Sequence, residues 1–190
     1  MTEDGIIFKT KICLLGESMV GKTSLIRKFV MDRFSDDYIS TLGTKVTKKT
    51  VAVERDEGTY DLTMMIWDIE GKRANLETNI ESFEGSIPAG YLKGSEGIFL
   101  VFDLTRKDTL EHVEAWFSGV TKQVGKEIPF ILLGNKKDLR DKQDVKPAEV
   151  EAKIEKLGLN VLYTSAKTGE NVEEAFQELA NRVLDNVTDA

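Results

Sequence analysis

Several residue types are scarce in this sequence, and each shortage excludes a class of protein. The 190 residues include one cysteine, so the chain has no disulfide framework and no cysteine-based zinc cluster. This residue, Cys13, lies in an apolar run and is expected in the core. Only 3 prolines accompany 41% hydrophobic residues, a composition typical of an ordered globular chain. The N-terminal stretch "MTEDGIIFKT" is too polar for a signal peptide or a membrane span. We therefore expect one cytoplasmic domain over residues 1–190.

Basic residues are also in the minority. Lysine and arginine number 26 against 33 aspartates and glutamates, which gives a formal net charge of −7. Because nucleic-acid binding draws on a basic surface, nucleic acid is not an expected partner. Any anion that this chain binds must be held by a local arrangement of groups.

Short apolar runs alternate with segments of helical periodicity. The runs are rich in β-branched or aromatic residues and predict buried strands at residues 6–16, 62–68, 97–103, 128–135 and 159–165. Helices are predicted at residues 22–31, 108–124, 147–157 and 172–187. The alternation favours right-handed βαβ units, and therefore an α/β fold with a mostly parallel sheet and helices on both faces.

One stretch departs from this alternation. Residues 45–68 hold two strand-like runs joined by a turn at residues 56–58, which predicts an antiparallel hairpin at the sheet edge and a sheet of six strands. Lys45, Lys48 and Lys49 lie on the first run. We interpret them as protection of an edge strand against unwanted pairing, with a binding patch as the alternative.

A phosphate-binding loop is predicted near the N-terminus. The stretch "GESMVGKT" at residues 16–23 matches G-x-x-x-x-G-K-[ST] between a predicted strand and a predicted helix. In this setting glycines let several backbone N–H groups point at phosphate oxygens, and the helix N-terminus adds its positive end. The alternative is a glycine turn with a surface lysine. The expected nucleotide-binding residues are Glu17, Ser18, Met19, Val20, Gly21, Lys22, Thr23 and Ser24.

A second motif predicts which base is bound. The run "IPFILLG" leads into "NKKD" at residues 135–138, where the Asp138 carboxylate can accept hydrogen bonds from two adjacent donors on a base edge. Guanine has such donors at N1 and N2, whereas adenine does not. A site built on such bonds can discriminate by roughly 10⁴ or more. An isolated N-K-x-D could be a hydrophilic turn, but after a strand and beside a phosphate-binding loop it indicates guanine.

With both motifs present, the chain resembles the Ras superfamily of small GTPases over nearly its whole length. The spacing in "GESMVGKTSL" and "FSDDYISTLG" looks closest to Rab-type members. The resemblance implies a single P-loop GTPase domain that binds GTP or GDP with Mg²⁺ and hydrolyses GTP. It also implies effectors, exchange factors and GTPase-activating proteins that contact two switch regions, and a role in vesicle trafficking.

The resemblance extends to single residues. Thr41 matches the threonine that closes over Mg²⁺ and the γ-phosphate, and "DIEG" at residues 68–71 matches the D-x-x-G that senses the same phosphate. Phe34 would pack against guanine and Tyr38 would lie over the phosphates. The implied metal ligands are Thr23, Thr41 and, through water, Asp68. The implied base-binding residues are Asn135, Lys136, Asp138, Leu139, Ser165, Ala166 and Lys167.

Two residues beside the phosphate sensor depart from the family pattern. Lys72 stands where the family usually has a glutamine that orients the attacking water, and Glu70 stands where it usually has an alanine. A lysine has no acceptor, so it cannot both hold the water and accept its hydrogen. Either hydrolysis is therefore slow, which we favour, or Glu70 orients the water while Lys72 offsets transition-state charge. The candidate catalytic residues are Lys22, Thr41, Glu70, Gly71 and Lys72.

Other features have no counterpart in the resemblance. Met19 replaces a usually small residue, and residues 73–97 are longer than in Ras or Rab proteins by roughly two helical turns. The longer segment is either a partner-specific surface or a tolerated insertion. The ending "RVLDNVTDA" lacks the cysteine of a prenylated tail, so we expect that the protein works in solution, that it reaches membranes through a partner, or that its C-terminus is trimmed. The single histidine, His112, is expected in solvent.

The sequence thus leaves two main hypotheses. The first is a guanine-nucleotide switch that hydrolyses GTP, slowly without an activating partner. The second is a scaffold module that holds GTP or GDP with negligible turnover. An ATP-using enzyme is a third hypothesis, and it fails if guanine is preferred.

Overall fold

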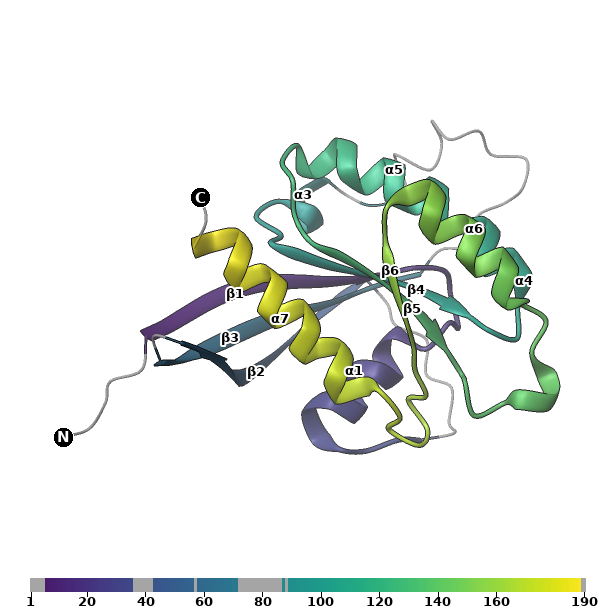
Figure 1. Cartoon of the computed structure of the whole chain (residues 1–190), viewed down its shortest axis with the longest axis horizontal. Coiled ribbons are helices and arrows are strands. Elements are labelled where there is room, and N and C mark those ends of the chain that lie inside the picture. The colour runs from purple at the N-terminus through teal and green to yellow at the C-terminus, as the bar shows by residue number, and fades with distance from the viewer. Residues whose placement is uncertain (1–5, 36–42, 57, 72–86, 88, 189–190) are drawn as a thin grey trace.

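Six strands form one sheet at the centre of the molecule (Figure 1). The structure is a computed structural model and describes residues 6–35, 43–56, 58–71, 87 and 89–188. The strand order is β2-β3-β1-β4-β5-β6, with β2 antiparallel to β3 and the other neighbouring pairs parallel. The strands are β1 (Ile6–Leu15), β2 (Thr44–Arg55), β3 (Gly58–Ile69), β4 (Gly97–Asp103), β5 (Phe130–Asn135) and β6 (Asn160–Tyr163). The predicted α/β fold with one antiparallel edge strand is confirmed.

Helices cover both faces of the sheet. Figure 1 shows α1 (Lys22–Met31) and α7 (Val172–Thr188) on one side, and α3 (Ala89–Leu92), α4 (Lys107–Glu111), α5 (Val113–Val124) and α6 (Pro147–Leu157) on the other. A short 3₁₀ helix, η1 (Arg140–Lys142), follows β5. The bounds predicted for α1 and α6 are confirmed. The prediction of one helix over 108–124 is wrong, because α4 and α5 are separate helices with His112 between them.

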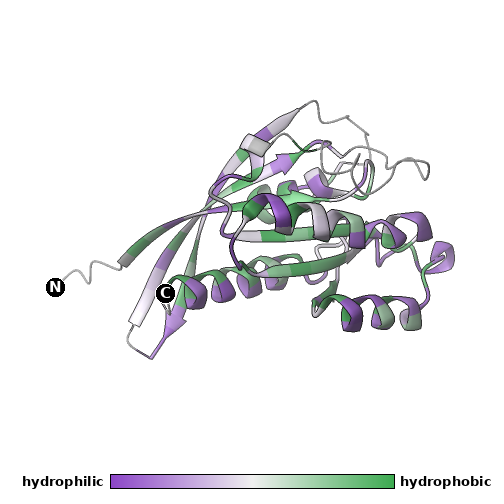
Figure 2. Ribbon diagram, turned by 90° about the horizontal axis from the view of Figure 1, so that it is seen from above, coloured by the Kyte–Doolittle hydropathy of each residue, from purple (hydrophilic) through white to green (hydrophobic). Residues whose placement is uncertain are grey.

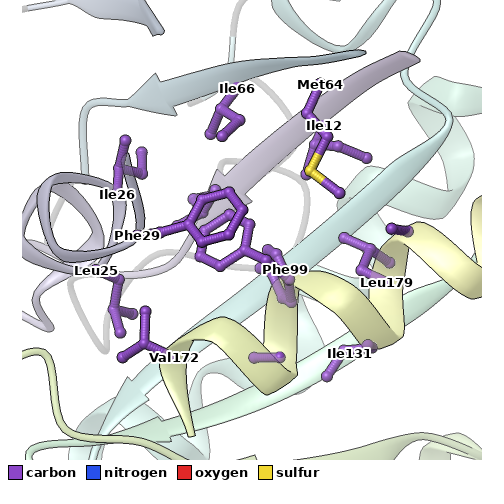
Figure 3. Packing of buried hydrophobic residues seen from close by; sticks show 14 of the residues in the cluster. Ile12, Leu25, Ile26, Phe29, Met64, Ile66, Phe99, Ile131, Val172 and Leu179 are labelled. Carbon is purple, nitrogen blue, oxygen red and sulfur yellow. The ribbon is translucent and has the colours of Figure 1, made fainter. Parts of the chain in front are cut away.

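The layer between the sheet and the helices α1 and α7 is aromatic at its centre. Phe29 of α1 stacks on Phe176 of α7 with ring centroids 3.8 Å apart, and Phe99 of β4 meets Phe176 edge-on. Figure 3 shows Ile12 and Met64 of the sheet in the same layer. Because stacked and edge-on rings resist sliding, this layer fixes α1, whose first residues form part of the candidate site.

The opposite layer is mostly aliphatic. Cys13, Leu100 and Leu132 of the sheet pack with Trp116 and Val120 of α5, and all five are buried. The predicted core position of Cys13 is therefore confirmed. Figure 2 shows the central strands mainly in green and the helices striped green and purple, as expected for amphipathic helices on a buried sheet.

The edge strand β2 is tied to α7. The Lys49 ammonium lies 3.7 Å from the centroid of the Phe29 ring and 3.2 Å from the Glu173 carboxylate. Arg55, at the other end of the strand, donates to the Asn181 side chain and pairs with Asp185. Lys49 thus holds the hairpin to the helices, whereas Lys45 and Lys48 are exposed on the edge strand, and their predicted protection of this edge stays a prediction.

The parallel strands bring five loops to one edge of the sheet. The loops after β1, β3, β4, β5 and β6 all leave from carboxyl ends, because these strands share one direction. β1 has β3 on one side and β4 on the other. Such a switch point in strand order opens a crevice outside the carboxyl end of the sheet, where ligands bind in folds of this class.

Candidate functional site

The loop between β1 and α1 has a backbone that depends on glycine at two points. Gly16, Met19 and Gly21 have φ angles of 139°, 67° and 100°. A Cβ on Gly16 would lie 2.2 Å from the Val101 carbonyl oxygen, and one on Gly21 would lie 2.3 Å from Asn135 Nδ2. The loop therefore packs closely on β4 and β5 and leads directly into the N-terminus of α1, an arrangement suited to binding an anion.

Lys22, the first residue of α1, points back into this loop. Its ammonium donates to the carbonyl oxygens of Gly16 at 2.8 Å and Glu17 at 2.7 Å, and the residue is only 6% exposed. Burial lowers the pKa of Lys22 from 10.5 to about 8, although the nearby Asp68 and Glu17 carboxylates act in the opposite direction. The loop thus encloses a cation that lacks the solvation it would have in water, and a phosphate group would supply the missing negative charge.

Thr23 and Asp68 bring two oxygen donors together beside Lys22. The Thr23 hydroxyl donates to Asp68 Oδ2 at 2.5 Å, which joins the first turn of α1 to the end of β3. Hydroxyl and carboxylate oxygens are the hard ligands that Mg²⁺ prefers, so this pair fits the predicted metal. Ser24 follows on the same turn and is half-buried.

Gly71 lies directly against the phosphate-binding loop. A Cβ at this position would come within 2.4 Å of Lys22 Nζ and 2.5 Å of the Glu17 carbonyl oxygen, so no larger residue fits without displacement. Its neighbour Glu70 faces elsewhere, because its carboxylate accepts from the Gly43 N–H at 2.9 Å. The end of β3 therefore touches the loop through Gly71 and the start of β2 through Glu70.

A buried charge cluster behind the loop was not predicted. The Glu17 carboxylate is 2% exposed and contacts both the His112 ring and the Arg106 guanidinium, the latter at 3.1 Å. Arg106 also donates to the Ser18 carbonyl at 3.0 Å. The expectation that His112 faces solvent is wrong, because its ring is 14% exposed and turned toward Glu17. The signal available in the sequence was Glu17 itself, a carboxylate in a buried loop that requires a cationic partner.

Asn135 links the phosphate-binding loop to the loop after β6. Its Nδ2 donates to the Val20 carbonyl at 2.9 Å, while its Oδ1 accepts from the Ala166 N–H at 3.2 Å and from the Thr164 hydroxyl at 3.3 Å. The side chain is 1% exposed. One amide therefore fixes the spacing among three loops that are far apart in the sequence.

Asp138 is held by the same loop that Asn135 contacts. The Ser165 hydroxyl donates to Asp138 Oδ1 at 2.6 Å and also accepts from the Thr168 N–H at 3.1 Å. The Leu139 N–H donates to the Lys136 carbonyl, which closes the turn after β5. The Ser165 bond uses one acceptor site of the Asp138 carboxylate, which has about four.

Two lysines flank this turn. Lys136 has a φ angle of 68°, and its ammonium lies 2.5 Å from Asp103, which is fully buried at the end of β4. The Lys167 ammonium lies 5.9 Å from the centroid of the Phe34 ring, which is 37% exposed. The structure thus brings Phe34, which follows α1 in the sequence, close to the loop after β6.

Most of the predicted site residues converge at this edge of the sheet. Tyr38, Thr41, Lys72 and nearly all of residues 73–88 lie outside the described residues, so their predicted roles stay predictions. Within the part of the chain that is described, no helix is long and apolar enough to cross a membrane.

Comparisons with known proteins agree with this arrangement. A model of the Ras family matches residues 11–185. The Ras-related protein RABA4b of Arabidopsis thaliana is 33% identical over 93% of this chain and 73% of the relative. The Ras-related protein Rab-13 of Bos taurus is 33% identical over 92% and 79%, respectively. The GTP-binding protein ypt2 of Schizosaccharomyces pombe is 33% identical over 95% and 84%.

Proposed function

This chain belongs to the Ras family and is Rab-like, and on that premise we propose that it is a guanine-nucleotide switch that binds GTP or GDP with Mg²⁺ and hydrolyses GTP slowly. The observation that carries the proposal is the Asn135 amide, which joins the phosphate-binding loop to the loop that holds Asp138. A base recognised at Asp138 and a phosphate chain bound at Lys22 would therefore belong to one ligand.

The phosphates would be held by the backbone N–H groups of residues 17–24, by Lys22 and by the N-terminus of α1. Gly71, which already lies against the loop, would offer its N–H to the γ-phosphate. The base would contact Asn135, Lys136, Asp138, Leu139, Ser165, Ala166 and Lys167, with Phe34 at its edge and Tyr38 over the phosphates. The Asp138 carboxylate would accept from the two guanine donors and thereby exclude adenine.

Thr23 and Thr41 would hold Mg²⁺, with Asp68 supporting the ion through water. When bound, the ion would neutralise charge that develops on the phosphate oxygens. The contribution of the chain is to fix these oxygen donors next to Lys22, so that the cation and the ammonium act on the same phosphate groups.

The slow rate follows from Lys72, which has no acceptor with which to orient an attacking water. A partner that inserts a cationic side chain could raise the rate by roughly 10³ to 10⁵, as an arginine finger does for Ras in the general scheme of phosphoryl transfer. We therefore propose regulators and effectors that contact residues 36–43 and 70–88. The protein would act in the cytoplasm, or at membranes through such a partner.

Single-turnover hydrolysis of GTP with Mg²⁺ tests the proposal, with the natural chain compared with Lys72→Gln. The natural chain should bind fluorescent GDP, release it to GTP but not to ATP, and hydrolyse GTP on the order of 10⁻⁴ s⁻¹ or slower. Lys72→Gln should speed hydrolysis by about tenfold, because a glutamine can both donate to and accept from the water.

Other outcomes would separate the remaining hypotheses. If Lys72→Gln hydrolyses GTP more slowly than the natural chain, Lys72 is part of a catalytic arrangement that differs from the usual one of the family. If both proteins bind GTP tightly and neither turns it over, the chain is a non-cycling scaffold. If ATP competes as well as GTP, the guanine assignment is wrong.

A further inference from the structure

The β2–β3 ladder ends in an unusual pair. The Glu70 N–H donates to the Gly43 carbonyl at 2.8 Å, which extends the ladder by one step beyond the pairing of Thr44 with Ile69. In a regular antiparallel pair the Gly43 N–H would then bond to the main-chain carbonyl of Glu70. Here it donates to the Glu70 carboxylate, at 2.9 Å. The side chain supplies the acceptor in place of the main chain.

The backbone leaves regular strand geometry at this end of the ladder. Gly43 has a φ angle of 72°, and Gly71 packs so closely on the loop before α1 that a Cβ would lie 2.5 Å from the Glu17 carbonyl oxygen. At this irregular pair the Glu70 side chain gives the Gly43 N–H a partner, which an alanine could not provide.

From this geometry we propose that Glu70 is a positioning residue whose carboxylate fastens the start of β2 to the phosphate-sensing end of β3. We call this contact the Glu70–Gly43 bridge. Gly43 comes two residues after Thr41 in the sequence, and Glu70 stands between Asp68 and Gly71. The bridge therefore joins the start of β2 to the segment that carries Asp68 and Gly71. The inference rests on the proposed function, and it assigns Glu70 a role different from orienting the attacking water.

Reach and charge can be separated at this position. Gln keeps an acceptor oxygen at the same distance from the backbone and removes the charge. Asp keeps the charge but is one methylene shorter, so it cannot span from Glu70 to the Gly43 amide in the same backbone. If the bridge is what matters, Gln should act like the natural residue and Asp should act like Ala. If the charge is what matters, Asp should act like the natural residue and Gln should act like Ala.

The experiment measures two quantities in Glu70→Ala, Glu70→Asp, Glu70→Gln and the natural protein. The first is the dissociation rate of a fluorescent GDP, and the second is hydrogen exchange at the Gly43 amide. We expect Ala and Asp to speed dissociation by about tenfold and to lose protection at Gly43, because the hydrogen bond that Gly43 donates to the side chain is lost. Gln should stay within about twofold of the natural rate and keep the protection.

A matched control removes a carboxylate from the same hairpin without touching the bridge. Glu54, on β2, is exposed, and Glu54→Ala should leave both quantities within about twofold. The proposal is overturned if Gln loses protection at Gly43, or if Asp retains it and dissociates GDP at the natural rate. A natural protein that binds no GDP would overturn the proposed function instead, and the exchange of the Gly43 amide would still test the bridge.

Discussion

Two sides of the candidate site follow buried parallel strands, but different contacts hold them. On the base side, residues 135–138 and 164–167, motif residues bond to one another, as Asp138 does to Ser165 and Asn135 to Ala166. On the predicted phosphate-sensing side, residues 68–71, Asp68 bonds to Thr23 of another motif, but the Glu70 carboxylate bonds to Gly43, which belongs to no motif. A motif that supplies its own partners can be recognised in the sequence, whereas one that uses partners from elsewhere requires the fold.

The strongest test of the base side is Asp138→Asn. The Asn side chain keeps an oxygen that can accept from Ser165, so the loop should survive, but its NH₂ group would face the N–H donors of guanine. We expect the affinity for GTP to fall by about 10³ or more, with a gain for xanthine nucleotides, whose ring carries an acceptor there. Competition between GDP and xanthosine diphosphate for the purified protein measures the change.

Asp141→Asn is the matched control, because Asp141 is exposed on the adjacent η1 and should leave selectivity unchanged. Unaltered guanine selectivity in Asp138→Asn would remove the assignment of this residue. It would also remove the contrast between the two sides, because no residue on the base side would then be assigned to guanine recognition.

The stability of the nucleotide-free protein and its affinity for nucleotide should both depend on pH through Lys22. Its pKa is lowered to about 8 by burial, against 10.5 in the unfolded chain. Between these values the unfolded state binds more protons, so the stability of the nucleotide-free protein should rise with pH across this window. Affinity for nucleotide should change in the opposite direction, falling by up to about tenfold per pH unit above 8, because phosphate requires the charged ammonium.

Thermal unfolding of nucleotide-free protein and fluorescent GDP titrations between pH 7 and about 10 measure both trends. Lys22→Arg is the control, because a guanidinium stays charged over the whole range and should flatten both curves. Equal pH dependence in the two proteins would assign the effect to another group and leave the Lys22 ammonium without the proposed role.

The fold and the motif residues could be predicted from sequence because they depend on local patterns. The apolar runs place the strands, and Gly16, Gly21 and Lys22 carry the loop conformation in their own chemistry. The break between α4 and α5 could not be predicted, because helical periodicity continues through His112. Likewise, nothing local indicates that Glu70 bonds to a residue 27 positions earlier.

The smallest expected effect concerns the charge cluster of Glu17, Arg106 and His112, in which the last two residues lie outside the phosphate-binding motif. Arg106 bonds to the Glu17 carboxylate and to the Ser18 carbonyl, so it holds two successive residues of the loop. Arg106→Ala removes one cationic partner of the buried Glu17 carboxylate, which keeps its contact with His112, and should speed GDP dissociation by about five- to tenfold. Arg106→Lys, which keeps the charge but not the two-pronged geometry, should fall between.

The double variant Glu17→Gln with Arg106→Ala distinguishes electrostatic support of the loop from simple packing. If Arg106 acts by compensating Glu17, removing the carboxylate should recover part of the lost GDP retention, and the two effects should not add. Guanine selectivity should stay unchanged throughout, since Asp138 and Ser165 lie on the base side. Strict additivity, or a loss of selectivity in Arg106→Ala, would instead mean that the two sides of the site are held by one shared network and that the contrast between them is wrong.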